Sequence, residues 1–179
     1  MEHIETEEAA ILRAKEDPQE FSLLYEKYFK RIFLFILHRM GEKDIAGDLT
    51  QEVFIKALQG SKKYELRGLL FSSWLFRIAI NECNEYSRRK KKIRVVTLEE
   101  RSVQHLAEEL SLEAFPDEIK NKLAYVIQRL KPLEVSIIEL RFFENKSFRE
   151  VGEILDLTEV NAKIRTYRII DKMKEILVK

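Results

Sequence analysis

Apolar residues in the first half of the chain recur every three or four positions, the spacing of a helix with one buried face. This spacing is followed by Phe21, Leu24, Tyr28, Ile32, Ile36 and Met40. Gly41 then predicts the end of that helix. A second helix is expected over about residues 44–60, closed by Gly60, and a third over about residues 71–88. We therefore predict a helical body from about residue 5 to residue 92.

The last third of the chain shows the same periodicity in shorter segments. One helix is expected in DEIKNKLAYVIQRL, and Pro132 is well placed to begin the next. The segment SFRE is typical of a capping box, in which Glu150 reaches back to the Ser147 amide. Asp156 and Leu157 are expected to form a turn before Thr158 caps a final helix. This order predicts a helix-turn-helix.

Residues 93–116 have a different character, with charged residues, scattered apolar ones and Pro116 at the end. A short helix over 104–112 is conceivable, but the periodicity is poor. We therefore expect an all-α fold of two small helical domains, residues 1–92 and 117–179. A flexible linker over 93–116 would join them.

Charge is unevenly distributed although the net charge is only +1. Residues 61–94 contain ten basic and three acidic residues, and five consecutive bases occupy 88–92. Residues 99–118 contain seven acids and one base, Arg101. A strongly basic block indicates a polyanionic partner. The acidic segment over 99–114 suggests a hypothesis of autoinhibition, in which it covers the basic face and competes with that partner.

Several classes of function find no support in the sequence. Cys83 is the only cysteine, so the chain forms no internal disulfide. His3, His38 and His105 lie far apart, which gives no metal-ligand spacing, and no phosphate-binding glycine loop occurs. No apolar run approaches the ~20 residues that span a bilayer. We expect a cytoplasmic protein that is not an enzyme and has no catalytic residues, no metal, no cofactor and no small-molecule substrate.

The third predicted helix carries two different stripes. Phe71, Leu75, Ala79, Cys83 and Tyr86 form an apolar one, which predicts a core face. The other stripe contains Trp74, Arg77, Asn81, Asn84 and Arg88. Aromatic rings stack on bases, amides bind base edges and guanidinium groups bind phosphates. This stripe favours nucleic-acid binding, although a solvated helix end whose cations complement the helix dipole is the alternative.

The second predicted helix has an exposed face of a different kind. Opposite its apolar positions lie Asp48, Gln51, Glu52 and Ile55. An isoleucine within an acidic stripe is typical of a docking face for a basic partner. An ordinary solvated face is the alternative.

The last predicted helix also has a polar face, distinct from its apolar one. This face consists of Asn161, Lys163, Ile164, Arg165, Arg168 and Lys172. Arginine and asparagine at the start of a recognition helix reach base edges in the major groove, and isoleucine contacts thymine methyl groups. The face therefore favours DNA binding, while a helical hairpin without DNA is the alternative.

Three segments in this order carry a resemblance: DLTQEVFIKAL, then F-x-x-WLFRIAINE with the basic run, then SFREVGEIL…KIRTYR. Together they resemble the sigma-70 family of bacterial transcription initiation factors, in its compact ECF (extracytoplasmic function) subgroup. The resemblance covers nearly the whole chain. It implies that the stripe Asp48, Gln51, Glu52 and Ile55 docks on the clamp helices of the largest subunit of core RNA polymerase. It also implies promoter DNA and an anti-sigma factor as partners.

The resemblance further assigns the promoter contacts. Recognition and melting of the −10 element would fall to Arg67, Phe71, Ser72, Trp74, Arg77, Asn81, Asn84, Arg88 and Arg89, with a flipped base near Asn81. The −35 duplex would be read by Asn161, Lys163, Ile164, Arg165, Arg168 and Lys172. The chain departs from the family pattern at Asp156, Val160, Asn161, Ala162, Ile164 and Thr166. The expected fold is unaffected, but the −35 preference is not inherited from the family.

Two other functions are compatible with parts of this pattern. A dimeric helix-turn-helix regulator would bind a palindrome without polymerase, but it leaves the stripe from Asp48 to Ile55 unexplained. An adaptor would use the basic helix on an acidic protein or a membrane surface, and it would not need the Asn81 amide.

Overall fold

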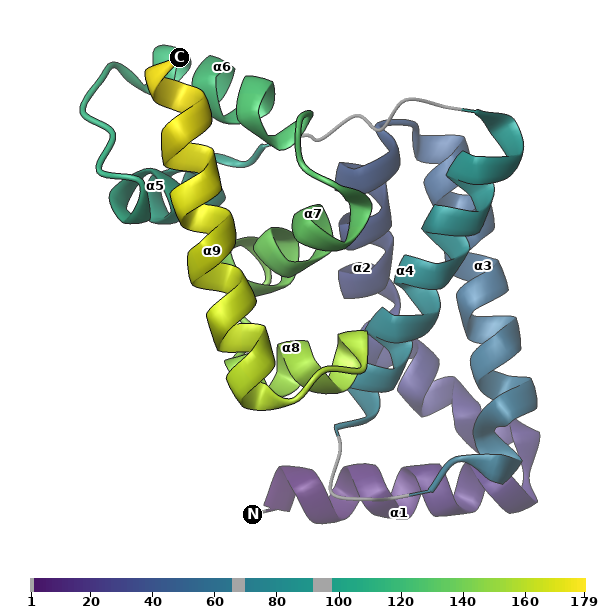
Figure 1. Ribbon diagram of the computed structural model, residues 1–179. Coiled ribbons are helices and arrows are strands. Elements are labelled where there is room, and N and C mark those ends of the chain that lie inside the picture. Colours follow the sequence, from purple (N-terminus) through teal and green to yellow (C-terminus); the bar gives the residue numbers. More distant parts are fainter. Residues whose placement is uncertain (1, 66–69, 92–97) are drawn as a thin grey trace. The chain divides into compact units, whose positions relative to one another are not determined.

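The computed structural model describes residues 2–65, 70–91 and 98–179, with side chains from Glu7 onward. The chain divides into two compact units, Met1–Ile93 and Arg94–Lys179. All regular structure in the described ranges is helical, as expected (Figure 1).

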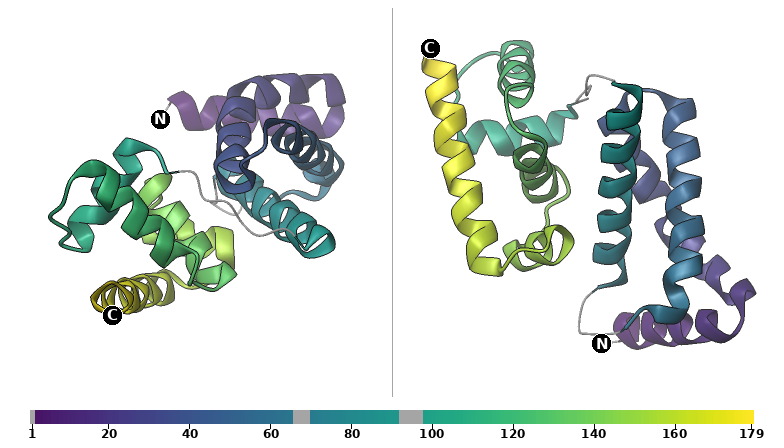
Figure 2. Two further views of the ribbon diagram at one scale, coloured as in Figure 1. Left: turned by 90° about the horizontal axis from the view of Figure 1, so that it is seen from above. Right: turned by 45° about the vertical axis from the view of Figure 1, so that its right-hand side comes forward.

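The first unit is built on three long helices. These are α2 (Phe21–Met40), α3 (Lys43–Gly60) and α4 (Phe71–Lys90), and each packs against the other two. At one end of these helices lies α1 (Glu2–Glu16), in contact with α2 and η2 (Ser61–Lys63) (Figures 1 and 2). A short turn, η1 (Pro18–Glu20), joins α1 to α2. Gly41 ends α2 in the left-handed conformation with φ 76°, which a glycine adopts without strain.

The core of the first unit is rich in aromatic rings. Phe71 on α4 is 2% exposed, and its ring lies 5.5–6.4 Å from those of Phe21, Tyr28, Tyr64 and Trp74. Offset and edge-to-face ring pairs add about 0.5–1.5 kcal/mol each beyond the burial of their area. The predicted stripe Phe71, Leu75, Ala79 and Cys83 is buried, whereas Tyr86 is only partly so. Phe71 therefore occupies the centre of this core.

The second unit consists of shorter helices and one long helix. These are α5 (Glu100–Glu109), α6 (Pro116–Ile127), α7 (Pro132–Ile138), the single π turn η3 (Glu139–Phe143), α8 (Phe148–Leu155) and α9 (Glu159–Val178). The long helix α9 packs against α6, α7 and α8 (Figure 1). Its buried residues are Ala162, Thr166, Ile169, Ile170 and Met173.

The helix-turn-helix forms as predicted from α8 and α9. Ser147 Oγ accepts a hydrogen bond from the Glu150 amide at 3.1 Å, and Glu150 accepts one from the Ser147 amide at 2.8 Å. Thr158 caps α9 in the same way through the Asn161 amide, at 3.1 Å. Asp156 ends α8 with φ 58°, a conformation that aspartate tolerates better than most residues. The turn follows closely on α8, since a Cβ on Gly152 would lie 2.5 Å from the Leu157 carbonyl oxygen.

The expected linker over 93–116 requires correction, because α5 lies within it and belongs to the second unit. Val103, Leu106, Ala107 and Leu110 are buried, and α5 packs on α6 and η3. The helix begins at Glu100, earlier than the conceivable helix over 104–112. Acidic residues between the buried positions obscured their spacing of three and four. The acidic segment over 99–114 therefore contributes part of the core of the second unit.

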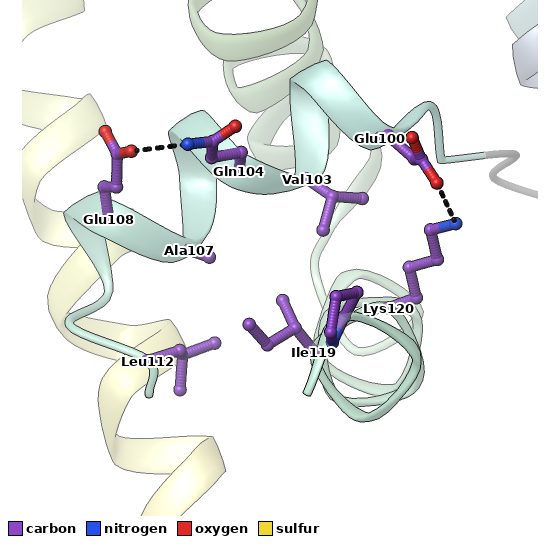
Figure 3. A pocket seen from close by; sticks show the side chains of 9 residues that line it. Glu100, Val103, Gln104, Ala107, Glu108, Leu112, Ile119 and Lys120 are labelled. Carbon is purple, nitrogen blue, oxygen red and sulfur yellow. Dashed lines mark hydrogen bonds and ion pairs between the residues drawn. The ribbon is translucent and has the colours of Figure 1, made fainter. Parts of the chain in front are cut away.

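A groove of about 360 Å³ lies between α5 and α6 (Figure 3). Its apolar lining includes Val103, Ala107, Leu112 and Ile119, while Glu100, Gln104, Glu108 and Lys120 supply polar groups. Lys120 on α6 pairs with Glu100 on α5 at 3.8 Å. This exposed ion pair joins α5 to α6 in addition to their apolar packing.

Candidate nucleic-acid interface

The polar stripe of α4 is largely on the surface. Asn81, Asn84, Arg88 and Arg89 are exposed, and Arg77 is partly exposed. These residues recur every three or four positions along α4, so they share one face of the helix. The Arg89 guanidinium lies 3.9 Å from the Glu85 carboxylate, which is a weak contact at this exposure. The amides and guanidinium groups are therefore accessible to a polyanion.

The aromatic and hydroxyl positions of the −10 assignment, Phe71, Ser72 and Trp74, are less exposed than its amides Asn81 and Asn84. Phe71 and Ser72 are buried, so neither presents a side chain to DNA, and this part of the −10 assignment is corrected. The reason is their place in the first turn of α4, whose apolar side faces the core. Trp74 is half-buried, with its ring 4.7 Å from that of Tyr64 and close to Gly60. It therefore contributes both to the core and to the surface.

Two basic positions of the expected interface, Arg67 and Lys92, lie outside the described residues. A further residue was missed. Arg39 on α2 is 1% exposed, and its guanidinium donates a hydrogen bond to the side-chain oxygen of Asn84 at 3.1 Å. The sequence offered only a basic residue in the last turn of a helix, which complements the helix dipole anywhere on its circumference. Only the packing of α2 on α4 shows that it supports the polar stripe.

The acidic stripe of α3 is exposed throughout, as a docking face requires. Asp48, Gln51 and Glu52 are exposed, and so is Ile55 at 47%. Next to Ile55, Lys56 forms an ion pair with Glu82 of α4. The hydrogen bond from Lys56 to Glu82 raises the pKa of Lys56 above its ordinary value. This ion pair links the two helices, so the acidic and the basic stripes lie on adjacent helices of one unit.

The polar face of α9 is exposed along its first half. Asn161, Lys163, Arg165 and Arg168 are exposed, and Ile164 is 43% exposed. Val160 and Tyr167, at 67% and 50%, extend this face with apolar surface that the sequence assignment did not include. The side of α9 that faces away from the core is therefore basic, with apolar side chains among the cations.

Lys172 differs from the other residues of this face because its ammonium group is already paired. It lies 2.7 and 3.0 Å from the two carboxylate oxygens of Glu134 on α7. Burial alone would raise the pKa of Glu134, but the hydrogen bonds from Lys172 and the Lys131 amide outweigh it and lower that pKa. Lys172 therefore fixes α9 to α7 and is less available to DNA than Arg165 or Arg168.

Among the described residues, no group of three or more His, Cys, Asp and Glu side chains could hold a metal ion. Within the same part of the chain, every helix is too short or too polar to cross a membrane.

Comparison with known proteins identifies both units. Residues 24–93 match the model of Sigma-70 region 2, and residues 126–175 match that of Sigma-70, region 4. The chain is 27% identical to the ECF RNA polymerase sigma factor BldN of Streptomyces coelicolor over 161 residues, which cover 88% of this chain and 60% of that protein. It is 25% identical to the ECF factor SigM of Bacillus subtilis over 154 residues, which cover 86% of this chain and 92% of that one.

A second ECF factor of Bacillus subtilis, SigW, is 26% identical over 163 residues, covering 86% of this chain and 87% of its own. A solved structure described as an RsbN-BldN complex is similar at 23% identity and a TM-score of 0.41, covering 93% of this chain. The matches to regions 2 and 4 fall on the helical body with the two stripes and on the helix-turn-helix, respectively. This protein therefore belongs to the sigma-70 family of transcription initiation factors, in its ECF subgroup.

Proposed function

We propose that this chain binds core RNA polymerase through the α3 stripe, reads the −35 duplex with α9 and captures the melted −10 strand on α4. Members of its family are initiation factors and not enzymes, in agreement with the expectation from the sequence. The polymerase performs the chemistry, and the chain supplies binding energy and specificity.

The observation that carries this proposal is the pair of oppositely charged, exposed stripes on α3 and α4. Acidic residues around Ile55 suit a basic protein surface such as a polymerase subunit, and they repel DNA. Amides and guanidinium groups on α4 suit a nucleic-acid strand. Because the two stripes lie on packed helices of one unit, polymerase and DNA could bind that unit simultaneously. A DNA-binding regulator that works without polymerase has no use for the first stripe.

The −10 step follows from the chemistry of α4. Flipping a base out of the duplex costs a few kcal/mol, which contacts to the freed strand must offset. Exposed Asn81 can hydrogen-bond to a flipped base, while Arg88 and Arg89 bind the backbone. Once polymerase holds both units, each DNA contact raises the effective concentration of the next. Neither unit then needs a high affinity of its own.

The −35 step rests on the exposed face of α9. Asn161 and Arg165 lie in its first two turns, where a recognition helix contacts base edges, and Arg168 follows one turn later. Ile164 and Val160 offer apolar contacts to thymine methyl groups. The clamp helices of the largest polymerase subunit as the docking partner, and an anti-sigma factor as an inhibitor, are further parts of this proposal.

Reconstitution with purified core polymerase tests the proposal. The chain should co-elute with the polymerase and direct transcripts from a defined set of sites in fragmented genomic DNA. Glu52→Arg should lower the affinity for core polymerase about tenfold or more, and so reduce co-elution, because it places a cation against a basic partner. Glu26→Arg, an equal charge change at another exposed position of the same unit, is the control.

Two further variants separate the DNA steps. Asn81→Ala should leave co-elution intact and lower transcription. Arg165→Ala should weaken binding of the −35 duplex by about 1–3 kcal/mol and relax specificity at one position, whereas Arg149→Ala on α8 should not. Tight binding of a palindrome by the chain alone, with no co-elution, would instead support the dimeric regulator.

A further inference from the structure

Arg39 combines burial with a full positive charge in the core of the first unit. It lies in the last turn of α2, and its guanidinium carbon is 5.7 Å from the centre of the Phe35 ring. Its Nη2 donates to Asn84 Oδ1 on α4 at 3.1 Å. Burying a charge is costly unless it is hydrogen-bonded, so losing the hydrogen bond from Arg39 to Asn84 would destabilise the first unit. This hydrogen bond therefore holds the Asn84 side chain in one orientation.

The chemistry of arginine determines how the Asn84 amide is oriented. A guanidinium has five N–H donors and no acceptor, so the atom that it contacts must be the amide oxygen and not the nitrogen. The NH₂ group of Asn84 then points away from Arg39. Among the described residues the Asn84 side chain makes no other hydrogen bond, and the residue is exposed. Asn84 thus presents two donors at the surface.

These donors lie within the stripe that faces the promoter in the proposed function. Asn84 is three residues from Asn81 and four from Arg88, the spacing of neighbours on one helix face. Phosphate oxygens and base acceptors are the groups that an NH₂ donor binds. An unheld amide can rotate and present its oxygen instead, which would repel a phosphate. The positive charge behind Asn84 also polarises the amide and strengthens its donors.

We propose that Arg39 is a positioning residue, which acts through Asn84 so that this amide presents only donors to the single strand. The inference rests on the proposed function, because it adds a positioning residue to the same DNA-binding stripe. The alternative is a purely structural role, in which Arg39 only stabilises the packing of α2 on α4 and Asn84 has no role in DNA binding.

A double-mutant cycle between Arg39→Met and Asn84→Ala distinguishes the two. Each variant is assembled with core polymerase, and binding of a labelled non-template strand from an identified promoter is measured. Asn84→Ala should weaken binding about tenfold, as expected for a hydrogen bond to a charged group. Arg39→Met should weaken it several-fold, and the double variant should bind no worse than Asn84→Ala. Fold-changes that simply multiply would overturn the proposal, because Arg39 would then act elsewhere.

Asn84→Asp gives a second test that leaves Arg39 in place. The carboxylate still accepts from Arg39, now as a charge-assisted hydrogen bond, so the melting temperature should be unchanged or higher. It has no donors, so strand binding should fall at least as far as in Asn84→Ala. Gln59→Glu adds the same charge at an exposed position of α3 and should have little effect. Wild-type strand binding by Asn84→Asp would refute the proposal, even if Arg39→Met does not fold.

The Asn81→Ala variant separates failure of this inference from failure of the proposed function. If Asn81→Ala loses strand binding while Asn84→Ala retains it, only the role of Arg39 and Asn84 is wrong. If the assembled wild-type chain binds no promoter strand, the proposed function itself fails.

Discussion

The two units of this protein are stabilised in different ways, although both are small and helical. In the first unit, the long helices α2, α3 and α4 have no side-chain hydrogen bond at their N-caps. They are joined by a continuous cluster of aromatic rings around Phe21, Phe54 and Phe71. In the second unit, α8 and α9 are each capped by a side chain, and a Glu134 carboxylate accepts the hydrogen bond of the Lys131 amide before α7. The side-chain caps of α8 and α9 satisfy backbone amides that a helix N-terminus leaves without a partner, whereas the first unit relies on the burial of its rings.

This contrast can be measured because the only tryptophan, Trp74, lies in the first unit. Tryptophan fluorescence therefore reports unfolding of the first unit, and amide hydrogen exchange reports both units segment by segment.

Phe71→Ala should have the largest effect. It leaves a cavity among four aromatic neighbours and should lower the free energy of unfolding of the first unit by about 3–5 kcal/mol. Denaturant unfolding followed by Trp74 fluorescence measures this loss. Leu23→Ala, at a 51% exposed position of α2, should change it by less than about 0.5 kcal/mol. An equal loss for both variants would mean that the ring cluster is not central.

Gly152→Ala should destabilise the second unit by about 1–3 kcal/mol, despite the better helix propensity of alanine. The added methyl group would meet the Leu157 carbonyl oxygen, which is backbone and must move with the whole turn. Hydrogen exchange in α8 and α9 should speed up, with Trp74 fluorescence unfolding unchanged. Protection equal to wild type would show that the turn has room to adjust.

Ser147→Ala should cost the second unit about 1 kcal/mol, because the Glu150 amide loses its acceptor. Ser147→Thr retains a hydroxyl acceptor and should be nearly neutral. Hydrogen exchange of the first turn of α8 is the measurement. If alanine and threonine behave alike, capping is not what distinguishes the second unit.

The smallest expected effect, and the most diagnostic one, is that the stabilities of the two units depend on pH in opposite directions. The pKa values of Glu134 and Glu150 are lowered from 4.5, because hydrogen bonds and nearby lysines outweigh the effect of burial. Their stabilisation of the second unit is therefore present above pH 4.5 and is lost as the pH falls through the lowered values. Burial raises the pKa of Tyr28, and the hydrogen bond to Glu82 raises that of Lys56.

In the first unit, the stabilisation by Tyr28 and Lys56 is thus complete below their ordinary values of 10.0 and 10.5 and is lost above them. Trp74 fluorescence against pH should show the alkaline loss, and hydrogen exchange of α7 and α8 the acid loss. Glu134→Gln should reduce the loss of stability that the second unit shows as the pH falls. If both units lose stability together in acid, the carboxylate contacts do not account for the difference.

Much of the architecture could be predicted from the chain, and particular residues show why. Ser147, Glu150, Thr158 and Pro132 act on backbone within a few positions, so their sequence spacing was sufficient to predict both caps and the helix start. The exposure of the acidic stripe of α3 and the basic face of α9 followed from helical periodicity. The helix α5 was anticipated only as a short helix within a linker, because its apolar face is narrow and acidic residues interrupt it.

The sequence by itself determined the helical class, the helix-turn-helix and the family, because these depend on local spacing and on motif order. Tertiary structure alone decided which polar residues are available. It buried Ser72, paired Lys172 with Glu134 and placed the Arg39 charge against Asn84. Such contacts join residues 38 and 45 positions apart, and they depend on how helices pack rather than on the pattern within any one of them.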